Sequence, residues 1–103
     1  MLGVGLLSAA WAPTEPPPPG PCEEAIARGK ALFKAGETDA ALAAFDSAVT
    51  LVGASGLRCR AEALYRIGVA RDHRGEFAAA EYPLGQAEAL AHELGDEHLL
   101  ASV

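Results

Sequence analysis

The residues of this chain with the most obvious capacity for chemistry are the two histidines and three carboxylates of HELGDEH, residues 92–98. A zinc-protease helix places its two histidines four residues apart, so that both imidazoles reach one metal ion. Here His92 and His98 are six residues apart, with Gly95 between them. We therefore expect no metal site, and interpret the stretch as a helix end, a stop at Gly95 and a cap for the next helix at Asp96.

No other set of reactive residues has the spacing that catalysis needs. The sequence contains no phosphate-binding loop and no nucleophile elbow. His73 falls in the last turn of a predicted helix, where it complements the helix dipole. Cys22 and Cys59 are 37 residues apart, whereas redox catalysis uses the C-x-x-C spacing. We expect no enzyme activity, and hence no catalytic residue, no metal ion and no cofactor.

Charge and composition limit the class of protein further. Eight Lys and Arg residues against 14 Asp and Glu residues give a net charge of −6, and no segment gathers enough basic residues to follow a phosphate backbone. Nucleic acid is therefore not an expected partner. The 103 residues have room for one small domain at most. Half of them are apolar, but many of these are alanine and few are aromatic, which favours thin layers of helices and an all-α fold.

The composition changes sharply near residue 13. Residues 1–12, MLGVGLLSAAWA, carry no charged side chain and are too short to span a bilayer, which needs about 20 residues. They predict a signal-peptide core or the stub of a membrane anchor, and a disordered tail is the alternative. Residues 13–21 predict a disordered Pro-rich linker. The protein is accordingly expected to be cytoplasmic, or else exported or attached to a membrane through its first 12 residues.

Residues 22–94 are predicted to be helical, and their pattern repeats. Residues 25–52 align with residues 64–91 at an offset of 39, with eight identities in 28 positions. The shared pair Gly36 and Gly75 predicts a turn between two helices in each unit, because a left-handed glycine commonly ends a helix. A fixed period of this size is typical of stacked helical repeats. The identical pairs are Gly29/Gly68, Ala31/Ala70, Gly36/Gly75, Glu37/Glu76, Ala40/Ala79, Ala41/Ala80, Ala48/Ala87 and Leu51/Leu90.

The apolar residues of each unit predict two helices that face each other. Gly29 and Gly68 let the backbones approach closely, and the larger Phe45 and Leu84 fill the space beside them. Pro83 falls inside the last helix, where it causes either a tolerated kink on the outer surface or a change in the curvature of the stack. The predicted stripes are Ala25, Gly29 and Leu32 with Ala41, Phe45 and Ala48, and then Leu64, Ile67 and Gly68 with Ala80, Leu84 and Ala87.

This order of small and large apolar residues around a turn glycine resembles the tetratricopeptide repeat (TPR), a helix-turn-helix unit whose copies stack into a superhelical scaffold. The resemblance covers two units, about residues 25–91. The period of 39 exceeds the family's usual length of about 34, and the surplus falls in the stretch VGASGLR between the units. Units of this longer period are similar to those of large bacterial signalling proteins. A generic pair of Ala-rich helical hairpins is the alternative.

The resemblance implies a fold of antiparallel helix-turn-helix repeats, as in a fragment of an α-solenoid, and a function in protein–protein interaction. The first helices of successive repeats would line a concave groove that binds a peptide or a helix of a partner protein. Positions rotated by about 100° from the packed face of these helices would face the groove. Ordinary solvated helix surface is the alternative. The six candidate groove residues are Ile26, Lys30, Phe33, Tyr65, Val69 and Asp72.

The same stacking bears on the two cysteines. Each precedes the first helix of a unit, and first helices of neighbouring repeats pack side by side. Cys22 and Cys59 are therefore either a disulfide formed in an oxidising compartment or two free thiols.

The end of the chain raises the question of a third unit. Residues 95–103 predict the start of a third repeat or a capping helix, and we favour the start of a repeat. Stacked repeats usually need about three units. An uncapped end that exposes Leu99, Leu100 and Val103 therefore predicts either marginal stability or self-association. An apolar segment, a Pro-rich linker and repeats, in that order, are similar to the docking or sensory tails of membrane-anchored bacterial serine/threonine kinases. A fragment of such a signalling protein is the rival function.

Overall fold

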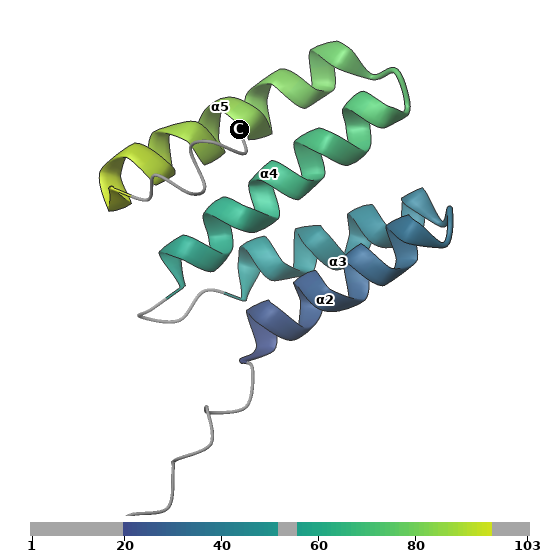
Figure 1. The fold of residues 1–103 in the computed structure, drawn as a ribbon, viewed down its shortest axis with the longest axis horizontal. Helices are drawn as coiled ribbons and strands as arrows, with labels where there is room; N and C mark the ends of the chain where they lie inside the picture. Colours follow the sequence, from purple (N-terminus) through teal and green to yellow (C-terminus); the bar gives the residue numbers. More distant parts are fainter. Residues whose placement is uncertain (1–19, 52–55, 96–103) are drawn as a thin grey trace, which may run out of the picture.

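The computed structural model describes residues 20–51 and 56–95, and in these ranges the chain forms four helices and no strand. The helices lie side by side in chain order, and each runs antiparallel to the one before it (Figure 1). The prediction of an all-α fold is confirmed for this part of the chain. The helices are α2 (Pro21–Lys34), α3 (Thr38–Thr50), α4 (Leu57–His73) and α5 (Phe77–Leu94).

Helix α2 begins within the predicted linker. Pro21 occupies its first turn, where a missing backbone N–H costs nothing because no helical carbonyl would accept from it. Residues 1–12, residues 13–19 of the predicted linker and residues 96–103 lie outside the described residues. No helix within the described ranges combines the length and the apolar character that crossing a bilayer requires.

Two tight turns close the hairpins α2–α3 and α4–α5. Gly36 and Gly75 have φ angles of 84° and 79°, in the left-handed region that favours glycine. In each turn, the N–H of the residue after the glycine donates to the carbonyl four residues before the glycine, at 2.9 Å. The predicted role of both glycines is confirmed. The two turns thus make matching hydrogen bonds at positions 39 residues apart.

The two helices of each hairpin approach closely at a glycine. A Cβ atom on Gly29 would lie 2.4 Å from the ring of Phe45, and one on Gly68 would lie 2.4 Å from Cγ of Leu84. The prediction that these large residues fill the space beside the glycines is confirmed. Ten of the sixteen buried apolar residues in the described ranges are alanine. The core is therefore thin, and its packing density depends on such close contacts.

We expect Gly29→Ala to lower the free energy of unfolding by about 1–2 kcal/mol, because the new methyl group overlaps a buried ring and this outweighs alanine's better helix propensity. Gly85, inside α5, is the matched control, since no atom lies within 4 Å of the Cβ it would gain. Gly85→Ala should raise stability by about 0.5–1 kcal/mol. Urea denaturation followed by circular dichroism measures both. A stabilising Gly29→Ala substitution would contradict the close α2–α3 contact.

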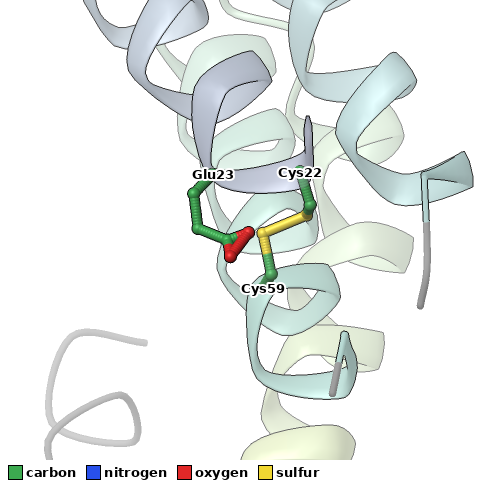
Figure 2. Close-up of side chains that lie close together, drawn as sticks. All are labelled: Cys22, Glu23 and Cys59. Carbon is green, nitrogen blue, oxygen red and sulfur yellow. A yellow bond between two sulfur atoms is a disulfide. The ribbon is translucent and has the colours of Figure 1, made fainter. Parts of the chain in front are cut away.

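A disulfide between Cys22 and Cys59 joins the first turn of α2 to the first turn of α4, with the two Cα atoms 6.4 Å apart (Figure 2). The sequence allowed either a disulfide or two free thiols, and the structure contains the disulfide. Helices α2 and α4 otherwise touch over a short region only, because α3 packs against both of them. The disulfide is therefore a main link between α2 and α4, while the packing of α3 against α4 also joins the two hairpins.

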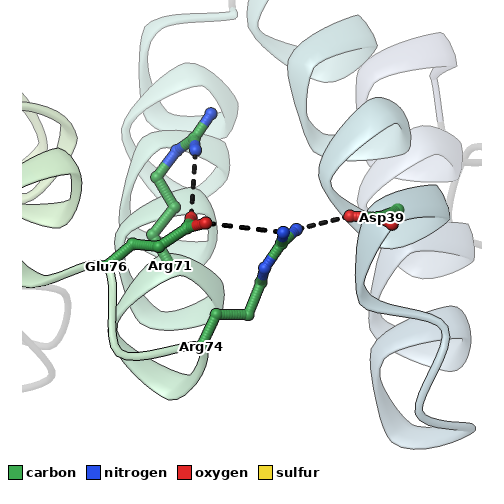
Figure 3. A network of polar contacts seen from close by, with 4 residues as sticks. All are labelled: Asp39, Arg71, Arg74 and Glu76. Atoms are coloured by element: carbon green, nitrogen blue, oxygen red, sulfur yellow. Dashed lines mark hydrogen bonds and ion pairs between the residues drawn. The ribbon is translucent and has the colours of Figure 1, made fainter.

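A network of ion pairs connects the second turn to the start of α3 (Figure 3). Arg74 pairs with Asp39 of α3 and with Glu76, and Arg71 pairs with Glu76 at 3.4 Å. The Asp39 side chain is 90% exposed. Because exposed ion pairs are weak, at about 0–1 kcal/mol each, the Arg74–Asp39 pair adds little to the stability of the fold.

Pro83 lies inside α5, which continues on both sides of it. Its neighbours Tyr82 and Gly85 are exposed. Ala79, whose carbonyl loses its helical partner at the proline, is exposed as well, so water can satisfy that carbonyl. These positions agree with the interpretation of Pro83 as tolerated on the outer surface.

Candidate partner-binding groove

A cavity of about 270 Å³ lies between α2 and α4, the first helices of the two hairpins. Phe33 and Val69 contribute apolar surface from the two helices, and Phe45 contributes from α3. The cavity therefore offers aromatic and aliphatic contacts to a ligand. Its full lining is Lys30, Ala31, Phe33, Lys34, Phe45, Arg66 and Val69.

A second cavity of about 210 Å³ lies between the same two helices, nearer their starts. It shares Lys30 with the first cavity, so the two are neighbours. We call them together the α2/α4 groove. The lining of the second cavity is Glu23, Ile26, Ala27, Lys30, Cys59 and Glu62.

Three cationic side chains line the first cavity, although the chain as a whole has a net charge of −6. Lys30 and Lys34 have no hydrogen-bond or ion-pair partner among the described residues. Arg66 has its Nε buried without a hydrogen bond, and Oε2 of Glu62 lies 4.0 Å from it. The charges of the two lysines are thus uncompensated by the described residues, and they attract anionic groups.

Phe33 is held in place by its neighbours. Its ring makes an edge-to-face contact with His73 of α4, with centroids 5.2 Å apart. It is half-buried and packs against the core cluster that contains Phe45 and Ile67. Because one side of the ring rests on the core and the residue also lines the cavity, a ligand would meet a fixed aromatic surface.

Of the six residues predicted for the groove, four line at least one of its two cavities and two line neither. Lys30 is exposed, Phe33 and Val69 are half-buried, and all three line the first cavity. Ile26 lines the second cavity but is only 5% exposed. Its expected exposure is wrong, because Ile26 lies one turn after Cys22 and packs in a core cluster with Ala48 and other residues beside the disulfide.

Tyr65 and Asp72 line neither of the two cavities. Tyr65 is half-buried, and the guanidinium carbon of Arg66 lies 5.9 Å from its ring centroid. Asp72 is exposed in the last turn of α4. These two residues of α4 are therefore beside the groove rather than in it.

Four residues that line the first cavity were not among the six predicted groove residues. They are Ala31, Lys34, Phe45 and Arg66. Lys30 and Lys34 are one helical turn apart, as are Arg66 and Val69, so helical spacing could have found Lys34 and Arg66. Phe45 gives no such signal. It comes from α3 and is 1% exposed, so its pattern is that of a core residue.

A third cavity, also of about 270 Å³, lies between α4 and α5. Its lining contains no aromatic residue and only one cationic side chain, that of Arg60. Because aromatic side chains supply most of the energy in typical protein interfaces, the α2/α4 groove is the stronger candidate.

No protein-family model, no curated protein and no solved structure matches this chain. A functional conclusion therefore depends on the fold and on the chemistry of the groove.

Proposed function

We propose that this protein is a scaffold for protein–protein interaction, which binds a peptide or a helix of a partner in the α2/α4 groove. The observation that carries this proposal is the cavity with Phe33 and Val69 in its walls and three cationic side chains in its lining. The proposed architecture is that of two TPR-like repeats. Matching turn hydrogen bonds and matching glycine contacts at positions 39 residues apart support it.

The lining of the cavity indicates the chemistry of the ligand. A volume of about 270 Å³ equals that of several water molecules at about 30 Å³ each, so it can admit an apolar side chain. Lys30, Lys34 and Arg66 would favour carboxylates beside that side chain. The proposed ligand is therefore a segment with a large apolar residue flanked by Asp or Glu.

A second candidate is a docking or sensory region of a membrane-anchored signalling protein, such as a bacterial serine/threonine kinase. The disulfide favours this candidate, because structural disulfides persist in oxidising compartments and are rare in the cytosol. An exported or anchored chain would place the groove outside the cytoplasm. The ligand chemistry proposed for the groove is the same in both cases.

Selection from a random peptide library, displayed on phage, tests the proposal without a known partner. We expect selected peptides to be enriched in Asp or Glu beside Leu or Phe. Val69→Asp should weaken binding of a selected peptide at least about tenfold, because it places a charge in the apolar wall of the cavity.

Ala43→Asp is the matched control. Ala43 is exposed on α3 and lines none of the three cavities described above, and the substitution changes the net charge by the same amount. It should leave peptide binding unchanged. Selected peptides without acidic enrichment, or equal losses in the two variants, would contradict the proposed groove.

A further inference from the structure

Cys22, Glu23 and Cys59 bring three metal-binding groups together where α2 and α4 begin. The two Sγ atoms and a carboxylate oxygen of Glu23 all lie within 4.8 Å of one another. Figure 2 shows the Glu23 carboxylate beside the disulfide. Cys22 is buried, Cys59 is half-buried and Glu23 is exposed, so the cluster is open on one side. That side meets the 210 Å³ cavity, which Glu23 and Cys59 both line.

The two cysteines are well placed to act as thiolate ligands once the disulfide is reduced. Each lies in the first turn of a helix, where the helix dipole stabilises the negative charge of a metal-bound thiolate. Tetrahedral zinc, with zinc–sulfur bonds of about 2.3 Å, holds two sulfur atoms roughly 3.8 Å apart. With the Cα atoms 6.4 Å apart, rotation of the two side chains can provide that separation.

A further carboxylate belongs to the same cavity. Glu62 lines it together with Glu23 and Cys59, and Glu62 follows Cys59 by one turn of α4. Oε2 of Glu62 also lies 4.0 Å from Nε of Arg66, and Lys30 lines the same cavity, so Glu23 is the carboxylate assigned to the metal. The cavity also leaves room for a water molecule as a fourth ligand, because it exceeds the volume of one water of about 30 Å³.

We propose that reduction of the Cys22–Cys59 disulfide creates a binding site for a thiophilic divalent cation such as Zn²⁺, with Cys22, Cys59 and Glu23 as its protein ligands. A dithiol reductant supplies two electrons and two protons to the sulfur–sulfur bond and becomes a disulfide itself. Binding of the cation then releases the two thiol protons. The metal then replaces the covalent bond as the link between the first turns of α2 and α4.

Titration of the phosphine-reduced protein with Co²⁺ and then Zn²⁺ tests the proposal. The phosphine takes oxygen from water as it reduces the disulfide to two thiols, and it leaves no competing thiol. We expect one equivalent of Co²⁺ to give thiolate charge-transfer and tetrahedral d–d bands, which Zn²⁺ abolishes. The oxidised protein should give neither band. A reduced protein without tetrahedral bands would overturn the proposal. So would a reduced chain that binds Co²⁺ as tightly when unfolded in concentrated urea as when folded.

Two adjacent glutamates provide a matched pair of variants. Glu23→Gln should raise the Kd for Co²⁺ at least about tenfold. Substitution of a residue that only hydrogen-bonds to a metal ligand already weakens metal binding by about that factor, and loss of a ligand should cost no less. Glu24 lies on the same turn of α2 outside the cluster, so Glu24→Gln should bind like the wild type. Equal affinities of these two variants would exclude Glu23 as a ligand and overturn the site. This comparison stays valid if cysteine variants fail to fold.

Discussion

Reduction of the disulfide in metal-free protein is expected to lower the free energy of unfolding by about 3–4 kcal/mol. The bond joins Cys22 and Cys59 across a sequence separation of 37 residues, so it restricts the unfolded chain over a large loop. Helices α2 and α4 make few other contacts with each other. Since small domains are stable by about 5–15 kcal/mol in total, reduction should leave this fold close to its unfolding threshold.

Urea denaturation with and without a phosphine reductant, in the presence of a chelator, measures this effect. The Cys22→Ala/Cys59→Ala double variant is the control, because it lacks the bond without any reductant. It should unfold at about the same urea concentration as the reduced wild type. A loss of less than about 1 kcal/mol would mean that α3 alone holds the two hairpins together.

Phe45→Ala is expected to cost about 3–5 kcal/mol, as is usual when a buried aromatic ring is removed. Phe45 is 1% exposed and is the largest fully buried side chain in the described ranges. It fills the space beside Gly29 and shares a core cluster with Ile67 of α4. Its ring therefore joins α3 to helices of both hairpins, and its loss leaves a cavity that the alanine-rich surroundings cannot fill.

Phe77→Ala is the matched control for this substitution. Phe77 is the first residue of α5 and is 64% exposed, so its removal should change the free energy of unfolding by at most about 0.5 kcal/mol. Thermal and urea denaturation of the two variants, followed by circular dichroism, measure the difference. Similar losses in both would contradict the burial of Phe45.

The helices and turns were predictable because their signals are local. Helical spacing of apolar residues predicts the helices, and the glycines at positions 36 and 75 mark where α2 and α4 end and where α3 and α5 follow. The contact of Gly29 with Phe45 was also predictable, because a short turn fixes how α2 faces α3. The interpretation of the hairpins as TPR-like repeats stays a proposal, as does the function that it implies.

The groove was predictable only in part, because it depends on how the two hairpins pack. The resemblance to the TPR, together with helical spacing, led to the prediction of Lys30, Phe33 and Val69 as groove residues, and all three line the first cavity. Spacing within α2 could not show that Ala48 of α3 and Ala63 of α4 cover Ile26. Pairing of the cysteines also depends on this packing, so the sequence left it open.

Backbone amide chemical shifts of the ¹⁵N-labelled, disulfide-bonded protein, followed during titration with a library-selected acidic peptide, test the proposed binding site most directly. We expect the largest changes at Lys30, Phe33, Arg66 and Val69, around the first cavity of the α2/α4 groove. The same peptide with Lys in place of each Asp and Glu should cause no change. Changes concentrated on α5, or equal changes with the basic peptide, would contradict binding at the cationic first cavity between α2 and α4.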